Sequence, residues 1–321
     1  MNVYLLNIGE LMSAGADVRM VSMLHRLDED RRKKVTSAGT LRGRAAAFGA
    51  GLLLQKAVGD WQADGFEGCP EESGETEQEV GFPEQPPRFR HCTLSGLLSE
   101  QTEAFSLTYR YGEKGKPYFR DVPLCFSLSH SGDYVLCAVS RQEVGADLQK
   151  IQPVDVWKLA KRFFSESECR TLERCESEGE RQRLFFGFWS RKEAFGKLTG
   201  EGVAAVLRED LQDGDGQGTA ELPEAVERCG DVQHRGGKCT VEQAETVPYR
   251  EEDGQDGSRK RAAELPEAAP FHGEGVRSVD AERNVEWMDF TPPEGYSVAV
   301  CRFRGKELGG ERAALEPGSE T

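Results

Sequence analysis

Three short segments of the sequence hold the residue types that bind phosphate groups or a divalent metal ion. They are FSLSHSGD at 126–133, GADLQ at 145–149 and WSRKEAFGK at 189–197. The first places a histidine between serines ahead of Gly-Asp, which suits a turn whose hydroxyl and backbone N–H groups bind phosphate oxygens. Taken alone, such a segment is more often an ordinary capped turn.

The second segment predicts part of a metal-ligand shell. Asp147 and Gln149 are two residues apart, so on a strand both side chains lie on the same face. A carboxylate oxygen beside an amide oxygen suits Mg2+, a hard ion that also keeps water and phosphate oxygens in its shell. The ordinary alternative is an exposed strand face.

The third segment predicts a functional stripe on a helix. Trp189, Glu193 and Lys197 follow one another at intervals of four, so they share one helical face. The carboxylate can bind a metal or accept a proton, and the ammonium can bind a phosphate. An exposed Glu-Lys helix pair is the ordinary alternative.

Strands and helices of ordinary length surround these segments. Apolar alternation and turn signals predict strands within residues 1–8, 105–119, 123–140, 142–149, 284–290 and 295–303. Helical patterns cover residues 28–58, 154–176 and 181–200, the last ending at a glycine, as many helices do. GADLQ is thus expected on a strand and WSRKEAFGK on a helix.

The net charge of −15 lies in two segments that lack hydrophobic periodicity. Residues 62–90 carry 8 acidic and 2 basic side chains, residues 208–283 carry 19 and 10, and together they account for the whole excess. Because both are rich in Gly, Glu, Pro and Gln, we expect two disordered insertions in a formally neutral fold. The acidity of the chain therefore says little about its ligand.

The remaining composition indicates the compartment. Nine scattered cysteines without a C-x-x-C pair predict reduced thiols, most of them buried. No apolar run reaches 18 residues, and the N-terminus lacks a basic segment followed by an apolar one. We therefore expect a cytoplasmic protein.

In their order along the chain, these segments resemble the motifs of the Sfp-type 4′-phosphopantetheinyl transferases. That family combines a G-K-P turn, an F-N-x-S-H-S-type segment, a G-(I/V)-D-(I/V)-E strand, a W-(S/T)-x-K-E-(A/S)-x-x-K helix and a closing G-Y-x-x-A-V strand. This chain also has GKP at 115–117, RFFSESE at 162–168 and GYSVAVC at 295–301. The resemblance covers residues 1–60, 104–207 and 284–303.

The resemblance implies an α+β fold of two similar halves related by a pseudo-twofold axis, each with a helix packed on a small sheet. We expect an N-terminal half at 1–140, a C-terminal half with the metal site at 141–307, and a flexible tail at 308–321. The active site would lie where the two halves meet.

Carried over residue by residue, the resemblance also implies the site. Asp147 and Glu193 bind Mg2+, and Gln149 stands where many relatives have a third acidic ligand. An amide can coordinate Mg2+ through its oxygen but brings no negative charge. Glu193 is the expected general base, and Trp189 is expected to pack the helix.

The coenzyme A contacts follow from the same resemblance. The residues expected around coenzyme A are Arg44, Lys116, Pro117, Ser129, His130 and Lys197. Of these, Lys197 stabilises charge on the phosphates and His130 positions the nucleotide. The basic residues 31–34 could extend this cationic surface or form a solvated helix face.

The implied activity is transfer of 4′-phosphopantetheine from coenzyme A to a serine of an apo acyl or peptidyl carrier protein. It is of the holo-acyl-carrier-protein synthase type, with 3′,5′-ADP as the leaving group and Mg2+ as the cofactor. We expect a monomer that acts without nucleic acid or membrane. Two alternatives stay open, namely a non-catalytic module that binds coenzyme A or a carrier, and a phosphoester hydrolase.

Overall fold

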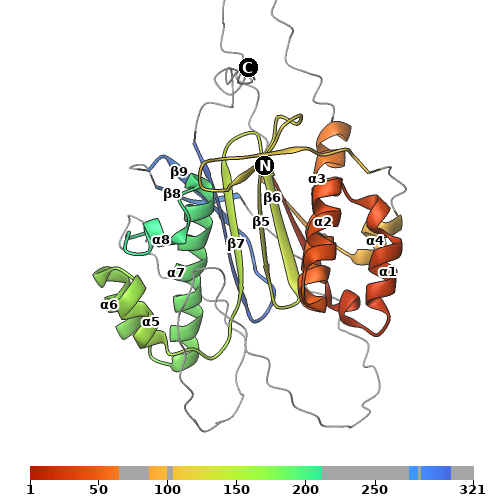
Figure 1. The fold of residues 1–321 in the computed structure, drawn as a ribbon. Coiled ribbons are helices and arrows are strands. Elements are labelled where there is room, and N and C mark those ends of the chain that lie inside the picture. Colours follow the sequence, from red (N-terminus) through yellow and green to blue (C-terminus); the bar gives the residue numbers. More distant parts are fainter. Residues whose placement is uncertain (65–86, 100–103, 212–274, 281–282, 305–321) are drawn as a thin grey trace, which may run out of the picture.

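The computed structural model describes residues 1–64, 87–99, 104–211, 275–280 and 283–304. They form two four-stranded sheets and a two-stranded hairpin, flanked by helices (Figure 1). The strands are β1 (Asn2–Asn7), β2 (Arg88–Cys92), β3 (Tyr109–Tyr111), β4 (Pro117–Phe119), β5 (Cys125–Ser131), β6 (Tyr134–Ser140), β7 (Val144–Lys150), β8 (Gly275–Asp280), β9 (Val285–Asp289) and β10 (Tyr296–Phe303). The α-helices are α1 (Ala16–Ser22), α2 (Glu29–Ser37), α3 (Leu41–Ala63), α4 (Leu94–Ser99), α5 (Val156–Phe163), α6 (Glu166–Glu173), α7 (Glu178–Thr199) and α8 (Val203–Val206), with short 3-10 turns at Gly9–Met12 and Leu24–Arg26.

The two large sheets come from different parts of the chain. The first has the strand order β2-β1-β6-β5, in which only β1 and β2 are parallel. The second has the order β7-β10-β9-β8 and is antiparallel throughout. The chain passes between them after Ser140 and before Val144. The α+β fold class is confirmed, and the division into units at 1–140 and 141–307 stays a prediction.

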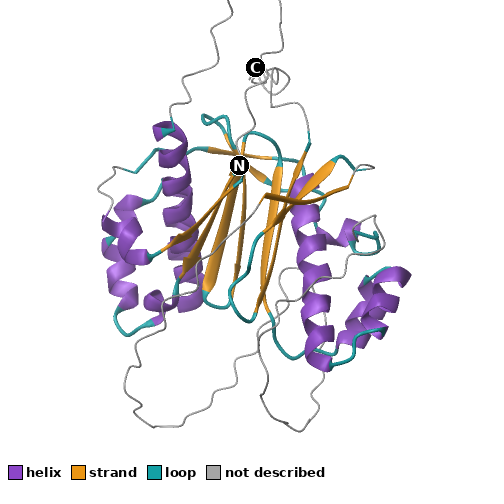
Figure 2. Cartoon of the chain, turned by 180° about the vertical axis from the view of Figure 1, so that it is seen from behind, coloured by secondary structure: helices purple, strands orange, loops and turns teal. Residues whose placement is uncertain are grey.

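The sheets pack on each other, and helices cover their outer sides (Figures 1 and 2). Strand β1 shows the principle, because Val3 and Leu5 enter the core between the sheets while Tyr4 and Leu6 enter the core under α3. A strand that is buried on both faces needs apolar residues in succession rather than in alternation. This is why residues 3–6 of β1 are all apolar.

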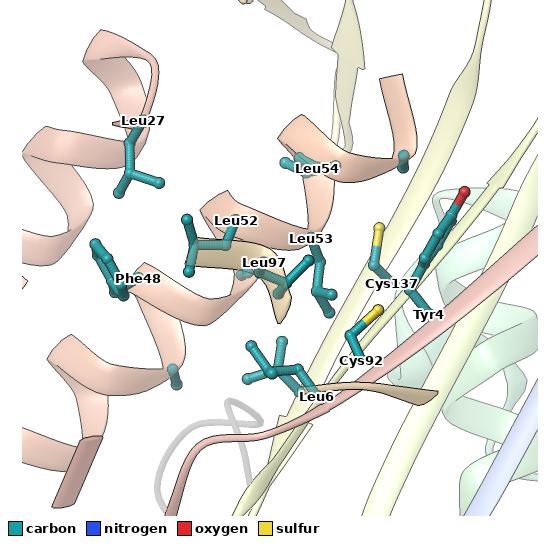
Figure 3. Packing of buried hydrophobic residues seen from close by; sticks show 14 of the residues in the cluster. Tyr4, Leu6, Leu27, Phe48, Leu52, Leu53, Leu54, Cys92, Leu97 and Cys137 are labelled. Atoms are coloured by element: carbon teal, nitrogen blue, oxygen red, sulfur yellow. The ribbon is translucent and has the colours of Figure 1, made fainter. Parts of the chain in front are cut away.

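Helix α3 covers the first sheet (Figure 3). Thr40 begins the helix by accepting a hydrogen bond from the Gly43 N–H, which satisfies one of the unpaired donors of the first turn. Phe48 and Leu53 are fully buried in the cluster that also holds Tyr4. The helix thereby anchors the first sheet from outside.

Helix α7 is the counterpart on the second sheet. Ser177 caps its first turn, and Gly200 ends it with a left-handed φ of 75°, a conformation that favours glycine. Leu198 packs in the cluster that holds Trp287 of β9, while Phe185 packs against α5 and α6. The predicted helix at 181–200 is confirmed, beginning three residues earlier.

A ladder of serine side chains joins the edges of the two sheets. On β5, Ser127, Ser129 and Ser131 accept hydrogen bonds from the N–H groups of residues 146, 148 and 150 on β7, at 3.0, 3.2 and 2.9 Å. Buried N–H groups on a sheet edge need partners, and here hydroxyls supply them in place of a neighbouring strand. The FSLSHSGD segment is therefore a strand that holds β7, with the turn only at its end.

Several elements differ from the expectations. The helix expected at 154–176 is two helices, because Ser165 forms a capping box with Glu168 and begins α6 anew. Strand β2 begins inside the range 62–90, at Arg88, and β8 lies inside the range 208–283, so the expected insertions are shorter than predicted. Their remainder, 65–86 and 212–274, and the expected tail at 308–321 lie outside the described residues. Helices α1 and α4 were not predicted.

The described cysteines are all free thiols, and five of the six are buried, as expected. Within the described ranges, none of the helices combines the length and the apolar composition needed to cross a bilayer.

Candidate active site

Asp147 on β7 stands at the centre of the candidate site. Its carboxylate is almost fully buried, with Oδ1 accepting hydrogen bonds from Ser129 Oγ and Lys197 Nζ, each at 2.8 Å. Oδ2 accepts a hydrogen bond from Gln149 Nε2 at 3.0 Å. The strand spacing thus predicts correctly that Asp147 and Gln149 share a face, and helix α7 brings Lys197 to the same place.

Glu193 lies one helical turn before Lys197 on α7 and is half-buried. Burial and then the charge of Asp147 raise the pKa of Glu193 to about 7, against the opposing effect of Lys197. Near neutral pH, such a carboxyl exchanges readily between its two protonation states. This is the property that a general base requires.

Trp189, the first member of the predicted stripe, packs among aromatic side chains of α5 and α7 rather than beside Asp147. Its ring lies 5.8 Å from that of Phe163 and 6.1 Å from that of Phe185, centroid to centroid. Trp189 therefore fixes α7 against α5, as expected.

Gly145 allows α7 to lie close enough to β7 for these contacts. A Cβ atom at this position would lie 1.9 Å from the carbonyl oxygen of Ala194 and 2.7 Å from the backbone nitrogen of Leu198. Both neighbours are backbone atoms and cannot move independently of the helix. The absence of a side chain at Gly145 thus sets the spacing between Asp147 and the residues of α7.

The change Gly145→Ala is expected to lower the free energy of unfolding by about 1–3 kcal/mol or more, because the added methyl group overpacks the contact between β7 and α7. Chemical denaturation with urea measures this change. Gly187→Ala is the matched control, since a Cβ at Gly187 on the same helix meets no atom within 4 Å. This control should be neutral or stabilising by about 0.5–1 kcal/mol, as expected for Gly to Ala inside a helix. Equal stability of the two variants would contradict the steric argument.

His130 extends from β5 and is exposed. Partial desolvation and the nearby charge of Lys197 lower its pKa, while Asp147 acts in the opposite direction. A neutral imidazole near neutral pH can still donate one hydrogen bond and accept another. His130 is thus close to the Asp147 and Lys197 pair without a direct bond to Asp147.

Lys116 and Pro117 lie at the hairpin of β3 and β4. The Lys116 ammonium is 2.8 Å from Glu143 Oε2 and donates to the carbonyl oxygen of Leu198 at 2.7 Å. The G-K-P turn is therefore fastened to the end of α7, next to Lys197. A phosphate contact of Lys116 would have to compete with Glu143.

The basic residues of the N-terminal half are arranged differently from the expectation. Arg44 forms an ion pair with Asp17 at 2.8 Å, whereas Arg42 donates to the carbonyl oxygen of Gly132 and to Asp133 in the turn after β5. Arg42 was not singled out in the sequence, although it is only two residues from Arg44. The structure thus joins Arg42, rather than Arg44, to the SHSGD turn.

The basic run at 31–34 is only partly a cationic surface. Arg31 is buried, and Arg32 donates to backbone carbonyl groups of residues 24, 25 and 27. Lys33 pairs with Glu29 on the exposed side of α2. Burial and the charge of Arg31 lower the pKa of Lys34. The two interpretations of this run were an extended cationic surface and a solvated helix face, and neither describes all four residues.

Asp147, Glu193 and Gln149 form a donor set that fits Mg2+. Among the described residues, no group of three or more His, Cys, Asp or Glu side chains gathers as a metal cluster. The set here is two carboxylates and one amide. Burial first and the charge of Asp147 second raise the pKa of Glu193, and a bound divalent cation would favour the ionised carboxylate against both. Mg2+ commonly takes one or two carboxylates and fills its shell with water and phosphate oxygens.

The segment that carries these residues matches a known family. The model of the 4′-phosphopantetheinyl transferase superfamily matches residues 143–244, a range that includes β7 and α7. Over this range, the chain is similar to members of that superfamily. Its relatives include a 4′-phosphopantetheinyl transferase of Bacillus pumilus, 44% identical over 119 residues, which are 36% of this chain and 50% of the relative.

Two further phosphopantetheinyl transferases are similar over longer stretches. Sfp of Bacillus subtilis (strain 168) is 35% identical over 151 residues, covering 43% of this chain and 66% of Sfp. HetI of Nostoc sp. (strain PCC 7120) is 37% identical over 137 residues, covering 39% of this chain and 56% of HetI. The chain thus spans between half and two thirds of the length of these relatives.

Proposed function

We propose that this protein transfers the 4′-phosphopantetheine arm of coenzyme A to a serine hydroxyl of an acyl or peptidyl carrier protein. The observation that carries the proposal is the cluster of Asp147, Glu193 and Lys197, which lies within the segment matched by the superfamily. The relatives named above, all 4′-phosphopantetheinyl transferases, support the same reaction class. Because several of them are of the Sfp type, we propose broad carrier use rather than a dedicated holo-acyl-carrier-protein synthase.

In the proposed reaction, the serine oxygen forms a bond to the β-phosphorus of coenzyme A, and the bond from that phosphorus to 3′,5′-ADP breaks. Glu193 accepts the proton of the serine, a role that its pKa of about 7 supports. Lys197, held at Asp147, places a positive charge near the phosphates as charge develops on the leaving group. His130, with Lys116 and Pro117, is proposed to line the nucleotide side of the site.

Mg2+ is the proposed cofactor, held by Asp147, Glu193 and Gln149, whose amide now donates to Asp147 and would turn its oxygen toward the ion. When bound, it would offset negative charge on the pyrophosphate of coenzyme A. Since Gln149 brings no charge, the two carboxylates carry the electrostatic part of the binding. We propose that Arg42, rather than Arg44, supports the turn that faces the ligand.

Intact-mass measurement of an apo carrier protein tests the proposal. Incubation with the protein, coenzyme A and Mg2+ is expected to add about 340 Da, the mass of the phosphopantetheine arm, and a chelator should abolish the gain. No gain with several acyl and peptidyl carriers, despite coenzyme A binding, would favour a binding module. Release of free phosphopantetheine without a carrier would indicate a hydrolase. Sedimentation would test the expected monomer.

A further inference from the structure

Ser129 differs from the other two serines of the β5 ladder in the group to which its hydroxyl donates a hydrogen bond. All three hydroxyl oxygens accept an N–H of β7, so all three contribute to joining the two sheets. Ser129 alone also donates to a carboxylate, Asp147 Oδ1, at 2.8 Å. One hydroxyl thus bridges the backbone N–H of Leu148 and the side chain of the residue before it.

This bridge restricts the orientation of the Asp147 carboxylate. Oδ1 is held by Ser129 from β5 and by Lys197 from α7, two elements on different sides of β7. Oδ2 accepts a hydrogen bond from the neutral amide of Gln149, through Nε2 at 3.0 Å. Hydrogen bonds to an ionised group are among the stronger ones, and both donors are anchored, Ser129 by its strand and Lys197 by the Ala146 carbonyl. Ser129 and Lys197 therefore fix the position of Oδ1 of Asp147.

We infer that Ser129 is a positioning residue that orients Asp147 for metal binding. This inference rests on the proposed function, in which Asp147 is a metal ligand, and it replaces the expected role of Ser129 as a contact of the nucleotide. With Oδ1 held by Ser129 and Lys197, Oδ2 is the oxygen that faces the cation once the Gln149 amide, which now donates to it, turns its own oxygen toward the ion. Side chains that orient metal ligands in this way typically contribute about 10- to 100-fold in metal affinity or activity.

The Ser127→Ala variant is the matched control, since Ser127 accepts the Ala146 N–H in the same ladder and has a similar burial to Ser129. Both variants should lose a similar amount of stability, because each leaves one buried N–H of β7 without its partner. Only Ser129→Ala should also loosen Asp147. Ser129→Thr keeps the hydroxyl, so we expect it to retain most of the orientation of Asp147 and most of the stability of wild type.

Mn2+ binding to the full chain without coenzyme A, measured by electron paramagnetic resonance, provides a readout that does not depend on turnover. We expect Ser129→Ala to weaken Mn2+ binding about 10- to 100-fold, Ser127→Ala by less than about twofold, and Ser129→Thr to lie close to wild type. Thermal unfolding of each variant establishes that it is folded at the temperature of the titration. In transfer assays, the Mg2+ concentration for half-maximal rate should rise for Ser129→Ala, while the KM for coenzyme A stays nearly constant.

Four results test the inference, and the last of them separates it from the proposed function. If Ser129→Ala and Ser127→Ala bind Mn2+ equally, or if Ser129→Ala mainly raises the KM for coenzyme A, the positioning role is wrong. If wild type binds no Mn2+, the positioning role is also wrong. If wild type binds Mn2+, the variants differ as expected and no carrier is modified, the positioning role stands and the proposed transfer reaction fails.

Discussion

Replacing Glu193 by Gln is expected to lower the rate of phosphopantetheine transfer by about a thousandfold or more. The amide keeps the size of the side chain but cannot accept the proton of the carrier serine, and it removes one of the two charges proposed to hold Mg2+. Both effects act on the same step. The measurement is single-turnover transfer to an apo carrier, followed by intact mass at saturating coenzyme A.

The same variant should change stability in a way that depends on pH. The folded-state pKa of Glu193, about 7, lies above its ordinary value of 4.5, so the fold disfavours the ionised carboxylate. In wild type without metal, this destabilisation is absent below pH 4.5, grows as pH rises towards 7, and is complete above it. Glu193→Gln should therefore be more stable than wild type by about 1–3 kcal/mol at pH 8, with no such advantage at pH 4.

Glu178→Gln is the control for these measurements. It makes the same chemical change at the exposed first turn of α7, where Glu178 pairs with Arg181. Its transfer rate should stay near that of wild type. A rate for Glu193→Gln within tenfold of wild type would exclude Glu193 as the base and ligand. Loss of transfer with an unchanged stability profile would instead show that burial and Asp147 do not raise the pKa of Glu193.

The sequence predicts the face on which each chemical group lies better than the contacts that the group makes. Asp147 and Gln149 share a strand face because strands repeat every two residues, and Glu193 and Lys197 share a helix face because helices repeat every 3.6. These periods do not say which helix lies on which strand. That packing depends on Gly145, whose missing side chain admits the backbone of α7.

The contacts that were not predicted are those between segments far apart in the chain. The spacing of Ser127, Ser129 and Ser131 indicates one strand face, and only the structure shows that this face lies against the edge of β7. Arg42 and Arg44 look alike in sequence, and the direction of each side chain on α3 decides which one reaches Asp133. Strand β2 was missed because RFRHC follows an acidic, proline-rich stretch and pairs in parallel with the distant β1.

Replacing Lys192 by Met is expected to lower the free energy of unfolding by about 3–5 kcal/mol. Lys192 precedes Glu193 on α7, is fully buried, and lies 3.0 Å from Glu168 of α6, which is also fully buried. Its ammonium also donates to the carbonyl oxygen of Glu209. Burial raises the pKa of Glu168 and lowers that of Lys192, and each charge counteracts the shift of the other. Met would leave the Glu168 carboxylate buried without its cation.

The double variant Glu168→Gln with Lys192→Met separates the cost of an unpaired charge from the value of the pair. A neutral amide at position 168 can still accept the Ser165 N–H that begins α6, so we expect most of the lost stability to return. Lys33→Met is the control, because the Lys33–Glu29 pair is exposed and its loss should not change stability measurably. Urea denaturation of the four proteins measures these differences, and equal destabilisation by the single and double variants would show that Lys192 contributes packing rather than charge. The buried pair also holds the turn of α7 that carries Glu193 between α6 and the strand that carries Asp147. We therefore expect Lys192→Met to lower the transfer rate as well, and the double variant to recover most of that rate.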